Sequence, residues 1–220
     1  MTVRKNYETL EVEVDEALVW ATINRPKVLN ALNVKVLEEL LELLEETVYP
    51  SAARVLVIQG GGDKAFVAGA DIGAMGKMSG REILDFVRLG QEVTKALEAA
   101  PFVTVAKVQG FALGGGCELA ITCDLIVAAD NSKFGIPEVK RGLAAAAGGL
   151  VRLPRQIPSR VAMEMALTGD FMDADRALSL GLINQIAPAG EALAQAKALA
   201  AKIAVAPARS DRKSTRLNSS

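Results

Sequence analysis

A run of three glycines and a nearby glutamate are the residues whose types and spacing could do chemistry. Gly114, Gly115 and Gly116 precede the segment CELAITC, which is typical of the start of a buried helix. Glycines at such a turn let the backbone approach a ligand closely, and the first N–H groups of a helix have no intrahelical partner. Glu118 lies one helical turn after Gly115, on the same face. The pattern predicts a backbone anion site beside a carboxylate; tight strand–helix packing is the alternative.

The absence of histidine limits the chemistry further. Without histidine the chain cannot build Ser-His-Asp or Cys-His nucleophile systems, and most zinc sites are excluded. Acid–base chemistry must then use carboxylates, lysine or tyrosine. Glu138, which follows Pro137 in an irregular segment, is a second candidate carboxylate, and a solvated loop acid is the alternative interpretation.

Bulk properties indicate a compact protein without an obvious polyanionic or membrane partner. The 220 residues are 50% hydrophobic, which suits one large domain, or one and a half. The net charge of −1 gives no electrostatic case for nucleic acid or a membrane surface. Cys117 and Cys123 are typical of buried small residues and predict neither a disulfide nor a metal site. No signal region or membrane span is expected, so the predicted location is cytoplasmic.

The elements that must position these residues alternate between strands and helices. A hairpin is predicted over 7–14 and 18–24. A helix over 34–49 should begin at the N-cap Asn33 and keep its glutamates off the apolar face. A buried strand over 54–59 and an apolar loop over 64–71 come next. The long helix over 79–100 should start with a Ser79–Glu82 capping box.

The second half repeats the alternation. A strand begins at Phe102, and 110–123 is interpreted as a turn and helix. The later elements are a strand over 124–129, an irregular segment over 133–141, helices over 161–168, 173–180 and 191–205, and a strand over 182–187. Strand–loop–helix units with no hairpin after the first predict an α/β fold with right-handed crossovers.

The end of the chain differs from the rest. The polar, basic segment DRKSTRLNSS (211–220) resembles the translation of a sequencing adapter; a disordered tail is the alternative. We therefore expect a core domain over 1–190, the start of a truncated C-terminal helical region over 191–209, and a non-native tail over 210–220. Apolar surface that the missing end would cover should then lower solubility and ligand affinity.

Six segments resemble the enoyl-CoA hydratase/isomerase (crotonase) superfamily, in matching order and spacing over residues 5–209. They are NRPKVLNAL (24–32), KAFVAGADI (64–72), VQGFALGGGCELAITCDLIVAA (108–129), FGIPEVKRGL (134–143), GGLVRLPR (148–155) and AMEMALTGDFMDADRALSLGLIN (162–184). The resemblance implies a crotonase (ClpP-like) fold, a spiral of repeated ββα units. It also implies a homo-oligomer, a trimer or a dimer of trimers, for the full-length protein.

The resemblance assigns expected roles to single residues. Ala70 and Gly115 match the two backbone N–H donors that hold a thioester oxygen, and Glu118 and Glu138 match the catalytic glutamates. No metal and no cofactor are expected, because coenzyme A is part of the acyl-CoA substrate. The residues expected to bind substrate are Ala68, Gly69, Asp71, Ile72, Lys27, Val28 and Gly114.

The implied reaction adds water to a 2-trans-enoyl-CoA and gives a 3-hydroxyacyl-CoA. Backbone donors would stabilise the enolate oxygen. Glu138 is expected to be mainly the base that activates water and Glu118 mainly the acid that protonates the α-carbon. Isomerisation or dehydration on the same scaffold, thioester hydrolysis, and an inactive acyl-CoA-binding fragment stay open. The family's P-G-x-GG segment is AAAAGG (144–149) here, which leaves chain-length preference open.

Other polar residues have simpler interpretations. Asp71 is expected to make a local Asx-type hydrogen bond and Asp124 to act as a structural turn acid. Trp20 is expected in the core. Lys64 and Lys107 are expected to be solvated, with a phosphate contact as the alternative.

Overall fold

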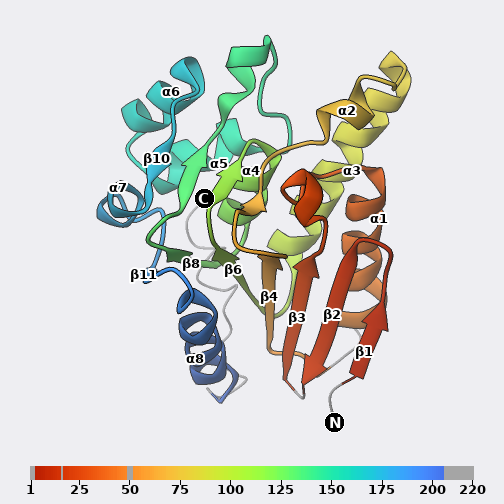
Figure 1. The fold of residues 1–220 in the computed structure, drawn as a ribbon, viewed down its shortest axis with the longest axis vertical. Helices are drawn as coiled ribbons and strands as arrows, with labels where there is room; N and C mark the ends of the chain where they lie inside the picture. The colour runs from red at the N-terminus through yellow and green to blue at the C-terminus, as the bar shows by residue number, and fades with distance from the viewer. Residues whose placement is uncertain (1–2, 16, 49–51, 206–220) are drawn as a thin grey trace.

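A seven-stranded sheet forms the centre of the molecule (Figure 1). The computed structural model describes residues 3–15, 17–48 and 52–205, so the predicted tail over 210–220 lies outside the described residues. The strand order is β1-β2-β3-β4-β6-β8-β11, antiparallel from β1 to β3 and parallel from β3 onward. The strands are β1 (Val3–Asn6), β2 (Leu10–Asp15), β3 (Leu18–Ile23), β4 (Val55–Gly60), β6 (Val103–Val108), β8 (Leu125–Ala129) and β11 (Gln185–Ala187).

A second sheet consists of four short strands, which the sequence does not predict. Its order is β10-β9-β7-β5, with β5 (Ala65–Val67), β7 (Phe111–Leu113), β9 (Lys133–Gly135) and β10 (Met172–Asp173). Three segments predicted as loop, turn or irregular structure, 64–71, 110–123 and 133–141, therefore each contain a strand. These strands have only three residues each, and their pairing partners lie far away in the chain.

The chain alternates between the two sheets. β4, β6 and β8 belong to the large sheet, and each is followed by a strand of the small sheet and then by a helix. The expected α/β architecture with repeated ββα units is confirmed. The first unit, β2 and β3 followed by a helix, is the predicted hairpin and pairs Leu10 with Ile23 in antiparallel register.

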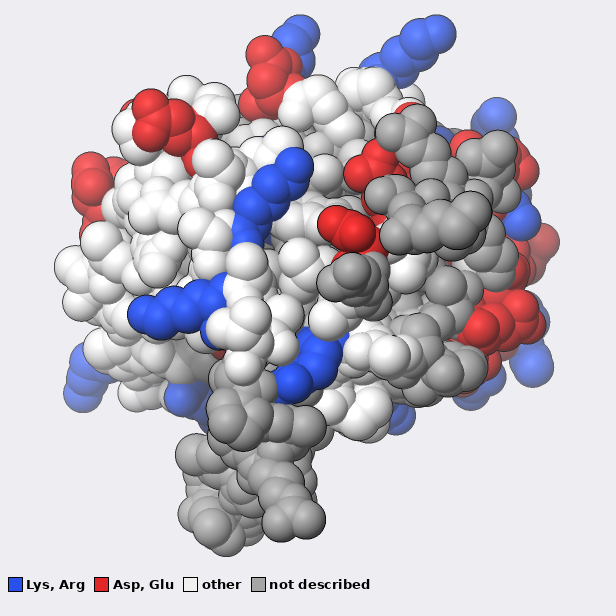
Figure 2. All heavy atoms as spheres, turned by 90° about the horizontal axis from the view of Figure 1, so that it is seen from below, with Lys and Arg blue, Asp and Glu red and all other residues white. Residues whose placement is uncertain are grey.

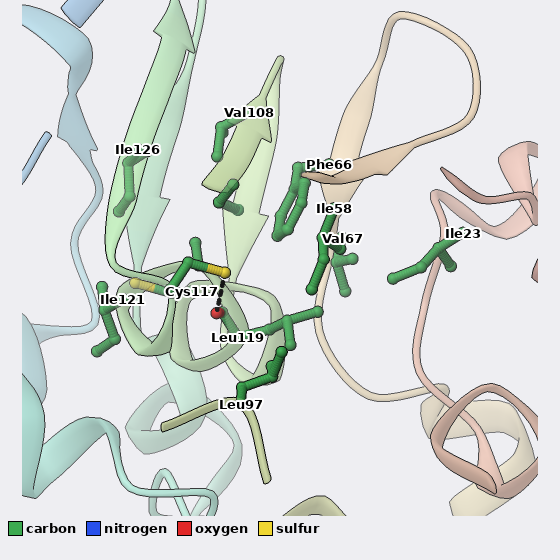
Figure 3. Close-up of a cluster of buried hydrophobic side chains, with 14 of the residues drawn as sticks. Ile23, Ile58, Phe66, Val67, Leu97, Val108, Cys117, Leu119, Ile121 and Ile126 are labelled. Carbon is green, nitrogen blue, oxygen red and sulfur yellow. Dashed lines mark hydrogen bonds between the residues drawn. The ribbon is translucent and has the colours of Figure 1, made fainter. Parts of the chain in front are cut away.

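One face of the large sheet packs against three helices. They are α1 (Val34–Glu42), continued by the π-helical η2 (Leu43–Val48), α3 (Gly80–Ala99) and α4 (Gly115–Thr122). The local start signals predicted from the sequence are confirmed. Asn33 accepts from the amide of Val36, and Ser79 and Glu82 form a reciprocal capping box. Figure 3 shows side chains of α4 among those of both sheets; the labelled residues include Cys117, Leu119, Ile121, Phe66, Val67, Val108 and Ile126.

The opposite face packs against α8 (Ala192–Ala204), which lies at the lower end of the molecule in Figure 1. Trp20 is buried among the apolar residues between the sheet and α8, which include Val57, Val105 and Ala196, as expected for a core residue. Because β4 and β6 are covered on both faces, they are buried at every position except Gln59 and Lys107. Figure 2, viewed from the α8 end, shows acidic and basic side chains scattered over that face with no broad area of one charge.

The remaining helices pack against α4, against one another and against strands of both sheets. They are α5 (Gly149–Gln156), α6 (Ser159–Thr168) and α7 (Ala174–Ser179), and short helical segments occur at η1 (Pro26–Val28), α2 (Ile72–Met75) and η3 (Pro137–Arg141). Pro154 lies inside α5. No helix in the described ranges has both the length and the apolar character needed to cross a membrane.

Glu39 contradicts the expectation that the glutamates of the first helix lie away from its apolar face. Its carboxylate is buried and accepts hydrogen bonds from the amides of Glu8 and Thr9, at 2.8 and 2.9 Å, and from the Thr9 hydroxyl at 2.6 Å. These bonds replace the water that burial removes. Glu39 thereby fastens α1 to the segment that leads into β2.

Candidate active site

The glycine turn brings the backbone of several segments into direct contact. Gly114, with φ 52° and ψ −126°, links β7 to α4 and donates its N–H to the carbonyl of Gly135 at 2.8 Å. A Cβ on Gly116 would lie 2.0 Å from the Val67 carbonyl oxygen of β5, so no side chain fits there. The close-packing interpretation therefore holds for Gly116, while Gly114 is the N-cap and Gly115 the first residue of α4.

Glu118 lies one turn into α4 and is 3% exposed. Its Oε1 accepts a hydrogen bond of 2.7 Å from the amide of Gly149, the first residue of α5. Burial raises the pKa of the Glu118 carboxyl, while the amides of the loop before α5 and the charge of Arg152 oppose that rise. The carboxylate of Glu118 is therefore held by another helix start and keeps partners that favour its anion.

Glu138 approaches the same turn from η3. A Cβ on Gly114 would lie only 2.9 Å from Oε1 of Glu138, so the carboxyl lies directly against the turn. Oε2 of Glu138 is buried and has no hydrogen-bond partner among the described residues. Burial, with a contribution from the charge of Glu118, raises the pKa of Glu138 to about 7. An unpartnered buried carboxyl oxygen is costly in a structural role and is typical of a functional one.

The charges of both carboxyl groups also affect the pKa of one buried thiol, that of Cys117. Burial raises the pKa of Cys117 to about 12, and the charges of Glu118 and Glu138 both add to that rise. The thiol is therefore protonated at neutral pH and acts as a buried small residue, as the sequence predicts. Glu118 lies in the first turn of α4 and the Glu138 carboxyl lies against Gly114, the N-cap of that helix, so the structure brings the two predicted glutamates to the same helix start.

The segment that contains Ala70 lies against the glycine turn. Leu32 forms a parallel bridge with Ala70, in which its N–H donates to the Gly69 carbonyl at 2.8 Å. A Cβ on Gly115 would lie 3.2 Å from Cδ1 of Leu32, and one on Gly114 would lie 3.6 Å from Cα of Gly69. Within the described residues, neither the Ala70 nor the Gly115 amide donates a hydrogen bond to another backbone group. Two free donors thus belong to neighbouring segments.

The Asp71 side chain is committed to local structure. Its Oδ1 accepts from the amide of Ala74 at 3.1 Å, as the N-cap of α2, and its Oδ2 pairs with Arg25 at 2.9 Å. The Arg25 guanidinium lowers the pKa of Asp71. This is the Asx-type bond expected from the sequence, with an ion pair that the sequence analysis missed. The Asp71 backbone is committed as well, because its N–H donates to the Leu32 carbonyl at 2.7 Å and its carbonyl accepts from the Met75 amide at 2.9 Å.

The other predicted substrate-binding residues lie in the 68–72 segment and in η1. Ala68 donates its N–H to the Leu29 carbonyl at 3.0 Å, which joins the 68–72 segment to the turn after η1. Ile72, Lys27 and Val28 are exposed. Beside them is a cavity of about 270 Å³, lined by Pro26, Lys27, Leu29, Asn30, Gly61, Gly62, Asp63, Lys64 and Ala65. Two lysines therefore flank one cavity next to the predicted substrate segment.

A larger cavity lies away from the predicted chemistry. It has a volume of about 610 Å³, is lined by residues of β2, β3 and α8, and includes none of the predicted site residues. Lys107 contributes to it and corrects the expectation of a solvated lysine: its Nζ donates to Oε1 of Gln109 at 2.7 Å, and burial lowers its pKa. Asp124 accepts from the amide and hydroxyl of Thr104, at 2.8 and 2.7 Å, and is structural as expected.

Comparison with known proteins assigns the architecture. The family model described as enoyl-CoA hydratase/isomerase matches residues 13–216. A crotonyl-CoA hydratase from Syntrophomonas wolfei is 43% identical over 197 residues, which are 90% of this chain and 76% of the relative. A short-chain-enoyl-CoA hydratase from Clostridium acetobutylicum is 41% identical over 198 residues, covering 90% of this chain and 75% of the relative.

Solved structures agree with the sequence comparisons. The crystal structure of an enoyl-CoA hydratase from Bacillus anthracis superposes with a TM-score of 0.92 at 30% identity, covering 96% of this chain and 83% of that one. An enoyl-CoA hydratase from Mycobacterium tuberculosis gives a TM-score of 0.85 at 40% identity, covering 96% and 81%. The expected crotonase fold is therefore confirmed.

Proposed function

The chain belongs to the enoyl-CoA hydratase/isomerase family, and from that membership we propose that it adds water across the double bond of a 2-trans-enoyl-CoA. The product is a 3-hydroxyacyl-CoA. The observation that carries this proposal is the pairing of a buried carboxyl group, Glu118, with a half-buried one, Glu138, at one glycine turn, where a buried oxygen of Glu138 has no partner among the described residues. A water molecule or a substrate carbon is the kind of group that such an oxygen could serve.

The thioester oxygen would be held by the backbone amides of Ala70 and Gly115. Addition of hydroxide to the β-carbon moves electrons onto this oxygen and forms an enolate. Two fixed N–H donors stabilise the enolate more than the ground-state carbonyl, and loss of one such donor costs about 3–4 kcal/mol in comparable sites. The free amides at both positions support this role.

The surroundings of the two glutamates favour a division of roles opposite to the one expected from the sequence. Burial raises the pKa of both carboxyl groups, but at Glu118 the Gly149 amide and the charge of Arg152 oppose the rise and favour the carboxylate, whereas the pKa of Glu138 is raised to about 7, which favours a carboxylic acid. We therefore assign Glu118 as the base that takes a proton from water and Glu138 as the acid that protonates the α-carbon. One proton moves onto Glu118 and one leaves Glu138, so proton exchange between them resets the pair.

Coenzyme A would lie along the segment from Ala68 to Ile72, with Lys27 and Val28 on its other side. Lys27 and Lys64 flank the cavity of about 270 Å³ and could pair with phosphate groups of the nucleotide. The name of the Syntrophomonas relative supports a short acyl chain. Exposed apolar side chains on α5 and α6 support the homo-oligomer; they include Leu150, Val151, Met163 and Leu167. The cytoplasmic location and the absence of a cofactor stay predictions.

The test uses the purified chain with four acyl-CoA substrates. Crotonyl-CoA should lose its conjugated absorbance and yield 3-hydroxybutyryl-CoA, identified by mass. 3-Hydroxybutyryl-CoA, a 3-enoyl-CoA and a saturated acyl-CoA report on dehydration, double-bond isomerisation and thioester hydrolysis. Turnover of the 3-enoyl-CoA without hydration would replace the proposal by isomerisation. Binding of acyl-CoA without any turnover would favour an acyl-CoA-binding role.

A further inference from the structure

The backbone at the start of α5 lies against the Glu118 carboxyl. The amide of Gly149 donates to Oε1 at 2.7 Å, and the amides of Ala147 and Gly148 also favour the anion. A Cβ on Gly149 would lie 3.0 Å from Cγ of Glu118, so the loop backbone lies directly against the side chain. The direction of the Glu118 carboxyl therefore depends on what holds residues 147–149 in place.

Arg152, one turn into α5, holds that loop from its other side. Its Nη1 donates to the Ala147 carbonyl at 2.8 Å, and its Nε and Nη2 donate to the two carboxylate oxygens of Glu98, both at 2.8 Å. A Cβ on Gly148 would lie 1.8 Å from Nη1, so the guanidinium occupies the space that a side chain would need. The Arg152 side chain is 13% exposed, and its fork fixes it to α3.

We propose that Arg152 is a positioning residue for Glu118: fixed by Glu98, its guanidinium holds the Ala147 carbonyl so that the amides of residues 147–149 stay directed at the Glu118 carboxylate. The inference rests on the proposed function, in which Glu118 is the base. Residues that orient a functional side chain without touching the substrate are best known from metal sites. There, their loss typically costs about 10- to 100-fold in activity.

The charge of Arg152 acts in the same direction as its hydrogen bonds. Two charged side chains face Glu118, Glu138 from η3 and Arg152 from α5. Arg152 lowers the pKa of Glu118 against the effect of burial. Removal of the guanidinium should therefore raise that pKa, both by loss of the charge and by release of the loop amides.

The test measures the pKa of the Glu118 carboxyl directly and does not depend on turnover. The chain is labelled with ¹³C-glutamate and titrated by NMR, and the Glu118 signal is assigned with Glu118→Gln. Arg152→Gln should move the Glu118 midpoint to higher pH by about one unit, and Arg152→Lys should move it less, because the positive charge stays. The matched control is Arg176→Gln, which breaks an exposed ion pair with Glu164 and should leave the midpoint unchanged.

Kinetics then separate positioning from a structural role. For crotonyl-CoA, kcat of Arg152→Gln should fall about 10- to 100-fold with KM within twofold, and the acid limb of the kcat–pH profile should move to higher pH. Where Arg152→Gln does not fold, Glu98→Gln, which releases the fork but keeps the arginine, should lower kcat by a smaller factor. An unmoved Glu118 midpoint in folded Arg152→Gln would overturn the inference even with an active parent. A parent without turnover would instead overturn the proposed function, and the titration would still decide the inference.

Discussion

Glu39 and the pair Glu118–Glu138 place buried carboxyl oxygens in two regions of one molecule, yet their environments act on them in opposite directions. The Glu39 carboxylate accepts three hydrogen bonds from Glu8 and Thr9, and Lys35 lies 3.6 Å away. Although burial alone would raise the pKa of Glu39, these partners lower it below the usual value. The pKa of Glu138 is raised to about 7, because burial is not compensated at its Oε2.

The difference shows that burial alone does not mark a functional carboxylate. Glu39 is anionic and satisfied, so it fastens α1 to the β2 segment and has no capacity left for a ligand. Glu138 keeps an unused oxygen, and Glu118 accepts a backbone amide on one oxygen. What separates Glu39 from Glu138 is whether hydrogen-bond donors replace the water that burial removes from each carboxyl oxygen.

The largest expected effect separates the two regions by activity. Glu118→Gln and Glu138→Gln should each lower kcat for crotonyl-CoA by about 10²- to 10⁴-fold, since an amide can neither accept nor deliver the proton. Glu39→Gln should leave kcat within a few fold. Steady-state kinetics on the three folded variants test this comparison, and unchanged turnover in both Glu118→Gln and Glu138→Gln would end the assignment of the site.

The second effect is smaller and concerns the free energy of unfolding, for which Glu39 should matter more than Glu138. Glu39→Gln places an amide NH₂ against a backbone N–H in either orientation, so we expect a loss of about 1.5–3 kcal/mol in the free energy of unfolding. Glu138→Gln should cause no comparable loss. Urea unfolding at pH 7 measures both. A Glu39→Gln protein as stable as the parent would contradict the structural role.

The pH dependence of stability sharpens the contrast. Because the pKa of Glu138 is raised in the folded state to about 7 from a usual value of about 4.5, the folded chain holds this proton when the unfolded chain has lost it. Its contribution to stability is therefore lost as pH rises from about 4.5 to 7. Glu138→Gln should gain stability relative to the parent over that window, on the order of 1 kcal/mol. Urea unfolding of the parent and of Glu138→Gln at several pH values measures this. If the difference between their urea midpoints stays constant from about pH 4.5 to 7, the pKa of Glu138 is not raised in the folded state.

The smallest effect concerns the surface partner of Glu39. Lys35 is half exposed and pairs with Glu39 at i,i+4 spacing. Lys35→Gln should cost only about 0.3–0.5 kcal/mol, because the backbone donors and the Thr9 hydroxyl stay in place. Urea unfolding at low and high salt tests this. A loss as large as that of Glu39→Gln would mean that the ion pair, and not the hydrogen bonds, holds the carboxylate.

Much of the fold could be predicted from local patterns. The Asn33 cap, the Ser79–Glu82 capping box and the apolar strands over 55–60 and 103–108 follow from signals within a few residues. The strands β5, β7 and β9 could not be predicted in this way, because each is three residues long and glycine-rich segments border them. The carboxylate of Glu39 was misplaced because its donors lie about 30 residues earlier in the chain.

The sequence by itself determined which chemistry is possible: no histidine, a glycine turn, and glutamates at 118 and 138. Helix periodicity and caps act over one turn, so they can be recognised without the fold. Only the tertiary structure decided what each carboxyl does, because desolvation and hydrogen bonding depend on atoms brought together from distant segments. The Gly149 amide beside Glu118 and the Gly114 turn beside Glu138 are such atoms.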